Sequence, residues 1–249
     1  MRCYLSFLLL VQLSAAMAQP EKANVARAGQ ATPGRDSCGD NRSIPSLVKH
    51  LAGIVIFKQS LAALNEQVKR EPGREFTVAF GQDSLGEVVA SGLEGGNKRS
   101  GVITALPFPV ADMHNHPRNT PPSSGDLYGL ISQNRKKGTY AVRFVLTSGD
   151  LMYALVITDS LAAHTFTKNY PSQQMPGYSP LFPDTVLQEY RDMLYRYGAA
   201  EEAAMAFVLE TYSTGVLLLK RYGNGPFLRL RTIVSGRGEQ RKFTAITCP

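Results

Sequence analysis

Apolar residues recur every three or four positions in the segment that follows Pro45. This stripe consists of Leu47, Leu51, Ile54, Phe57, Leu61, Leu64 and Val68. The spacing places these side chains along one side of a helix, so it predicts an amphipathic helix that begins at Ser46. The segment EPGRE, at 71–75, ends this helix because proline and glycine interrupt the helical pattern.

Shorter apolar runs follow and predict strands, because each is flanked by residues that favour turns. The candidate strands are EFTVAF (75–80), EVVASGL (87–93), GVITAL (101–106), PVADMHNH (109–116), TYAVRFVL (139–146) and LMYALVIT (151–158). The last two flank the turn TSGD and predict a hairpin.

Helical patterns separate these strands and continue after them. The segment SSGDLYGLISQNRKKG (123–138) begins with capping residues and ends in basic residues and a glycine, which predicts a helix. Further helices are predicted near 183–197 and 199–220, before a last hairpin formed by FLRLRTIV and KFTAIT. This order indicates an α+β fold with a C-terminal helical and hairpin extension.

The composition adds two constraints. Of 249 residues, 43% are hydrophobic and 19% are charged, which is typical of a globular protein. The net charge is +7, but the lysines and arginines are scattered along the chain. We interpret this as a solvated basic surface and expect no nucleic-acid partner.

The N-terminus has the pattern of a secretory signal peptide. Arg2 precedes an apolar run over 4–13, and Ala16 and Ala18 form an A-x-A site, so we expect a signal peptide at 1–18. The apolar run is too short for an ordinary membrane-spanning helix, so no stable insertion is expected after cleavage. A flexible leader follows at 19–45, and the mature protein is expected to be secreted or periplasmic.

Two cysteines remain after cleavage, Cys38 and Cys248, near opposite ends of the mature chain. An isolated pair in an oxidising compartment is a candidate disulfide. Two cysteines this far apart do not resemble a zinc knuckle.

The strongest chemical signal is the segment MHNHP, which contains two of the four histidines. On a strand, His114 and His116 point to the same side, and Pro117 ends the ladder. Ser123 can begin the following helix, which brings Asp126 back towards the histidines. Two imidazoles and one carboxylate can hold a tetrahedral zinc with a fourth position open for water, whose pKa zinc lowers to about 7.

Catalysis at such a zinc needs a general base for the proton of the water. Glu75, at the start of one predicted strand, and Glu87, after the next turn, are the two upstream candidates. Their spacing alone does not decide between them.

The segment from HNHP to SSGD resembles the H-x-H-P…S-x-x-D signature of JAMM metallopeptidases, also called MPN-plus or JAB domains, with one residue fewer before the serine. The resemblance implies that His114, His116 and Asp126 bind zinc. It also implies that Ser123 hydrogen-bonds the tetrahedral intermediate. The catalytic glutamate of the family lies on an early strand after a helix, and Glu75 matches that context better than Glu87.

The resemblance covers about residues 47–160 and implies a mixed β-sheet flanked by helices. We place this core at 46–165 and a C-terminal extension, packed on the core, at 166–249. The implied activity is zinc-dependent hydrolysis of a peptide or isopeptide bond in a protein or peptide substrate. The oligomeric state is left open.

Three other interpretations can be compared with this one. The letters HNH do not indicate an HNH nuclease, because in those enzymes the three residues are spread over a ββα unit. A non-catalytic JAMM-like binding domain is the main alternative. A third is an interaction protein that uses the predicted helix AAEEAAMAFVLETY to contact a partner.

Overall fold

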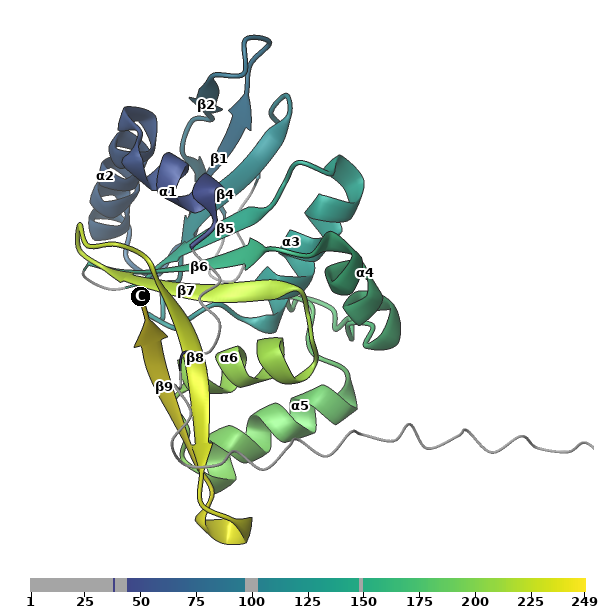
Figure 1. Ribbon diagram of the computed structural model, residues 1–249. Helices are drawn as coiled ribbons and strands as arrows, with labels where there is room; N and C mark the ends of the chain where they lie inside the picture. The colour runs from purple at the N-terminus through teal and green to yellow at the C-terminus, as the bar shows by residue number, and fades with distance from the viewer. Residues whose placement is uncertain (1–37, 39–43, 97–102, 148–149) are drawn as a thin grey trace, which may run out of the picture. The chain divides into compact units, whose positions relative to one another are not determined.

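The structure is a computed structural model that describes Cys38 and residues 44–96, 103–147 and 150–249. All of these belong to one compact unit, Ala31–Pro249. The predicted signal peptide, and the leader apart from Cys38 and residues 44–45, lie outside the described residues. A nine-stranded mixed sheet with helices on both faces confirms the predicted α+β fold (Figure 1).

The sheet is continuous from the first strand to the last, in the order β2-β1-β4-β5-β6-β7-β8-β9, with β3 paired to β1. The strands are β1 (Phe76–Gln82), β2 (Val88–Ala90), β3 (Glu94–Gly95), β4 (Pro109–Asn115), β5 (Val142–Leu146), β6 (Leu151–Ile157), β7 (Val216–Tyr222), β8 (Leu228–Ser235) and β9 (Lys242–Cys248). Among the strands of the described residues, only β4 and β5 are parallel neighbours, and helix α3 (Ser124–Lys137) connects them.

Two helices cover one face of the sheet. The predicted single helix is in fact two, α1 (Ser46–Gly53) and α2 (Val55–Arg70), because Ile54 has an extended backbone with ψ of 153°. Phe57 and Leu64 are buried against this face, with Phe80 and Phe144 of the sheet below them. Among the described residues, no single helix is long and apolar enough to cross a membrane. Helices α1 and α2 reach the required length and apolar composition only when they are taken together, and the chain bends by 70° between them.

The other face is covered by four helices. They are α3, α4 (Ser160–Asn169), α5 (Asp184–Arg191) with a π-helical turn at Asp192–Arg196, and α6 (Glu201–Thr211). Their apolar residues form a second buried cluster with those residues of β5 to β9 that point to this face of the sheet. The sheet thus separates two hydrophobic cores, since neighbouring strand residues point to opposite faces.

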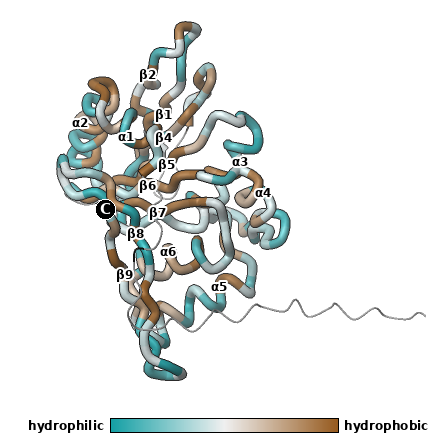
Figure 2. The backbone as a smooth tube through the Cα atoms, in the orientation of Figure 1, coloured by the Kyte–Doolittle hydropathy of each residue, from teal (hydrophilic) through white to brown (hydrophobic). Residues whose placement is uncertain are grey.

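The C-terminal half differs from the sequence prediction in two elements. The predicted helix over 199–220 is confirmed in its first half and wrong in its second: α6 ends at Thr211, and the apolar run VLLLKRY forms β7. Ser213 and Gly215, with φ of 47° and 67°, turn the chain between the two. The run pairs with β6 along its whole length (Figure 2 shows β6 and the first half of β7 mostly in brown). Helix α4 was not predicted.

The strands around β4 are also shorter than predicted. The candidate strand at 87–93 is reduced to β2, and residues 103–106 of the candidate at 101–106 form no strand. Pro107 and Pro109 lack backbone donors, and Phe108 between them has φ of 37°, so ladder pairing begins only at Pro109. The predicted hairpins β5–β6 and β8–β9 are confirmed.

Cys38 and Cys248 form the predicted disulfide, with their Cα atoms 5.5 Å apart. The bridge ties the segment before α1 to the end of β9. A disulfide of this kind is typical of an oxidising compartment.

Candidate metal centre

The end of β4 carries the histidine pair. Asp112, His114 and His116 alternate along the chain and point to one face of the sheet, which we call the metal face. His116 lies just past the strand, and its backbone N–H donates to the carbonyl of Leu146 at 2.9 Å. His114 is only 4% exposed, so both the strand and the core hold its ring in place.

Asp126 reaches the histidines from the first turn of α3. Ser123 is the N-cap of this helix, and its backbone N–H donates to Asp126 Oδ2 at 2.7 Å. The Ser123 hydroxyl also donates to Oδ2 at 2.7 Å and accepts from the Asp126 N–H at 3.3 Å. This reciprocal capping box fixes the carboxylate on the side of the helix that faces β4.

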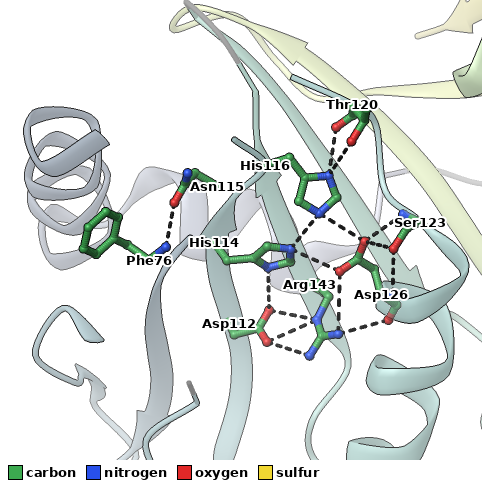
Figure 3. Close-up of polar contacts among 9 residues, drawn as sticks. All are labelled: Phe76, Asp112, His114, Asn115, His116, Thr120, Ser123, Asp126 and Arg143. Carbon is green, nitrogen blue, oxygen red and sulfur yellow. Dashed lines mark hydrogen bonds and ion pairs between the residues drawn. The ribbon is translucent and has the colours of Figure 1, made fainter. Parts of the chain in front are cut away.

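The three side chains converge on one point (Figure 3). His114 Nε2 lies 3.2 Å from His116 Nε2 and 3.1 Å from Asp126 Oδ1, and His116 Nε2 lies 3.3 Å from Asp126 Oδ2. One ligand atom from each residue lies within 4.8 Å of the others, as a metal site requires. Ligands of a tetrahedral zinc, at bonds near 2.0–2.1 Å, are about 3.3 Å apart, so the spacing fits zinc.

Each histidine has a partner on its other nitrogen. His116 Nδ1 lies 2.9 Å from the carbonyl oxygen of Thr120, which can only accept, so Nδ1 carries the proton and Nε2 is free to bind a metal. His114 Nδ1 lies 3.9 Å from Asp112 Oδ1. A carboxylate behind a histidine ligand orients the ring and increases its basicity.

Arg143 connects Asp112 of β4 to Asp126 of α3. From β5, its Nε and Nη2 donate to Asp112 at 2.8–3.1 Å, and its Nη1 donates to the backbone carbonyl of Asp126 at 3.2 Å. Gly129 of α3 makes room for this guanidinium, because a Cβ there would collide with it. The parallel pairing of β4 and β5 places Arg143 directly beside Asp112.

The charges of the metal-free cluster depend on one another. Burial opposes ionisation of both aspartates, but Arg143 and His114 lower the pKa of Asp112, and His116 and His114 hold the pKa of Asp126 well below its usual range. Burial also opposes a charged His114, yet Asp126 and Asp112 raise its pKa to about 10. A metal ion at this point would therefore replace the proton of His114.

The structure places the two candidate bases at opposite ends of β1. Thr77 pairs with His114, so the two side chains point to the same face of the sheet. Glu75 is two residues before Thr77, so this half-buried residue also points to the metal face, beside the end of β4. Glu87 is exposed and follows the turn at the far end of β1, where its N–H donates to Asp83. Of the two, Glu75 is the one that precedes the end of β1 paired with the histidine-bearing end of β4.

Asn115 fixes the segment that carries Glu75. Its side chain points away from the histidines, accepts from the N–H of Phe76 at 2.7 Å and donates to the carbonyl of Arg74 at 2.9 Å. The amide thereby clamps both neighbours of Glu75, as Figure 3 shows for Phe76.

Sequence reasoning found the three metal-ligand candidates but missed the residues that support them: Asp112, Asn115, Thr120 and Arg143. Asp112 and Arg143 were visible as single charges inside the apolar runs PVADM and VRFVL. A charge in a buried strand needs a partner, so each could have been paired with the other.

Comparison of the chain with family models, curated proteins and solved structures found no match.

Proposed function

We propose that this protein is a secreted or periplasmic zinc-dependent hydrolase that cleaves an amide bond in a protein or peptide substrate. The observation that carries the proposal is the convergence of His114, His116 and Asp126 within 4.8 Å, on a face that also carries Glu75. The disulfide and the N-terminal sequence support a location outside the cytoplasm.

Zinc, when bound, would act as a Lewis acid on the amide carbonyl and lower the pKa of a water nucleophile. His114, His116 and Asp126 would hold it, with Thr120 and Asp112 keeping the two rings oriented. Three protein ligands are the number that catalytic zinc sites use, so these residues would hold the ion without excluding water or substrate.

Glu75 would accept the proton of the attacking water and deliver it to the leaving amine, which makes it base and then acid. Ser123 lies next to Asp126, and its O–H would turn from Asp126 Oδ2 to the carbonyl oxygen, where negative charge develops. Arg143 would stay bound to Asp112 throughout and keep the metal face rigid.

The experiment compares Glu75→Gln with Glu87→Gln. Zinc-loaded wild-type protein is first incubated with a library of proteome-derived peptides, and cleaved peptides are identified by mass spectrometry. On one such peptide, Glu75→Gln is expected to bind zinc as wild type does but to be about 10²–10⁴-fold slower, because an amide does not accept the proton. Glu87→Gln is the matched control, and its rate should be unchanged.

A slow Glu87→Gln beside an active Glu75→Gln would move the base to Glu87. Equal rates in all three proteins would contradict the proposed mechanism. Zinc-loaded wild type that retains peptides without cleaving them would favour the alternative, a non-catalytic binding domain.

A further inference from the structure

A cavity of about 580 Å³ lies on the other side of the sheet from the metal centre. Its walls come from α1 and α2, from the ends of β5, β6 and β7, and from the turn after β7, which lies beside α2 in Figure 1. Leu146 and Met152 form part of its floor and pair with each other across the sheet. Leu146 follows Val145, the cross-strand partner of His114, so it points to the opposite face.

The cavity contains a buried arginine with no acidic partner among the described residues. Arg221 is 8% exposed, and its Nε is buried without a hydrogen-bond partner. Within the described parts of the chain, its side chain makes one polar contact, from Nη2 to the sulfur of Met152 at 3.5 Å, which is weak. The guanidinium otherwise lies over the rings of Phe227 and Phe57, at 4.8 and 5.8 Å from their centroids.

A buried cation of this kind is costly unless a counter-charge reaches it. Burial lowers the pKa of Arg221, in line with its lack of a carboxylate partner. Two other charged residues line the cavity, Lys58 and Asp150, and within the described parts of the chain neither forms an ion pair. The three together leave a net charge of about +1 in the cavity, which favours a ligand with a single negative charge.

The remaining walls combine apolar and polar side chains. They include Phe57, Leu61, Leu146 and Met152, and two amides, Asn65 and Asn224, lie among them. This mixture suits a ligand with an apolar body and one charged end. A carboxylate fits a guanidinium because its two oxygens match two parallel N–H donors.

We propose that this cavity binds a small organic carboxylate whose charge pairs with Arg221 and whose apolar body packs against Phe57, Leu61 and Met152. The site is separate from the metal centre, because the two lie on opposite faces of the sheet and share no side chain. The inference therefore stands independently of the proposed hydrolase activity.

The test uses octanoate as the probe and the full mature protein with its disulfide intact. Binding is measured by calorimetry and by amide chemical shifts in NMR spectra. Wild type is expected to bind octanoate, with shifts centred on the segments that line the cavity. Arg221→Met is expected to bind it about tenfold or more weakly, because the charge-assisted hydrogen bonds are lost.

Two further variants make the test specific. Ala62→Phe, at an exposed position on the cavity wall, is expected to weaken octanoate binding by filling the space while Arg221 remains. His116→Ala, on the metal face, should bind octanoate as wild type does. Octylammonium and inorganic phosphate serve as ligand controls, and both are expected to bind at least tenfold more weakly than octanoate.

Several results would overturn the proposal. Octanoate that does not bind wild type, or that binds Arg221→Met and wild type equally, would show that Arg221 is a structural residue stacked on phenylalanines. Phosphate that binds as tightly as octanoate would show that the apolar body of the ligand contributes nothing to binding, which would contradict the proposal. If Arg221→Met does not fold, undiminished octanoate binding by Ala62→Phe would still contradict it.

Discussion

Two buried arginines lie on strands of the same sheet and differ in almost everything but burial. Arg143 of β5 is 7% exposed and Arg221 of β7 is 8% exposed. Arg143 points to the metal face and donates to Asp112 and to the backbone of Asp126. Arg221 points to the opposite face, towards α1 and α2, and contacts aromatic rings and a thioether.

The difference indicates how each charge is used. The charge of Arg143 is fully compensated by neighbours in the fold, so it fixes the position of the side chains that it touches. No described residue forms an ion pair with Arg221, so its charge favours an anion from outside the fold. One face of the sheet thus holds an arginine that is paired within the fold, and the other holds a cavity that accepts a ligand.

The largest expected difference is in stability. Arg143→Met leaves the carboxylate of Asp112 buried without its partner, which should lower the free energy of unfolding by about 3–5 kcal/mol. Arg221→Met removes a charge that has no acidic partner, so stability should be unchanged or higher. Urea denaturation of both variants, with chelator present, gives the comparison. Equal losses would show that the two charges play the same role.

The next largest expected difference is in zinc affinity, compared between one variant on each face of the sheet. Asp112→Asn weakens the orientation of His114 and should lower zinc affinity by about 10–100-fold, as measured by competition with a zinc indicator. Asp150→Asn changes a carboxylate that lines the cavity on the other face and should leave zinc affinity as it is. A drop of similar size in both variants would contradict the separation.

The metal face should also respond to alkaline pH. In the metal-free protein, the pKa of His114 is raised from 6.5 to about 10 by Asp126 and Asp112, against the effect of burial. The resulting stabilisation is present below about pH 6.5 and is lost as the pH rises towards 10, by at most about 1.4 kcal/mol per pH unit.

Urea denaturation between pH 6 and pH 10 measures this dependence, and His114→Gln should show a flatter one. Parallel curves for the two proteins would mean that His114 is not the group that loses its proton.

The smallest expected effect concerns the helix that delivers Asp126. Ser123→Ala removes the N-cap side chain of α3 and should cost about 1 kcal/mol of unfolding free energy. Ser124→Ala is the neighbouring control; its hydroxyl donates to the carbonyl of Pro180 and not to the cap. A larger loss in Ser124→Ala would show that the loop contact, rather than the cap, holds this end of α3.

The sequence predicted the metal-ligand candidates because their geometry is local. His114 and His116 are two residues apart on one strand, and Asp126 follows in the first turn of the next helix. The supporting network is not local: Arg143 meets Asp112 only because β4 and β5 pair in parallel. Pairing partners depend on the whole sheet, so this contact could not be placed from periodicity.

The fold was predicted in class but not in every element. The run VLLLKRY was assigned to a helix because a short apolar run fits a buried strand or a buried helix equally well. Its burial between β6 and β8 decides the outcome. The cavity around Arg221 was not predicted, because its walls come from three segments far apart in the chain.

The central claim is that His114, His116 and Asp126 hold a zinc ion, and metal analysis tests it most directly. Mature protein purified without chelator, or incubated with zinc and then desalted, is analysed by plasma mass spectrometry together with His116→Ala. We expect about one zinc per chain in wild type and none in the variant. Wild-type protein that stays metal-free after incubation with zinc, or His116→Ala that retains a full equivalent, would contradict the claim.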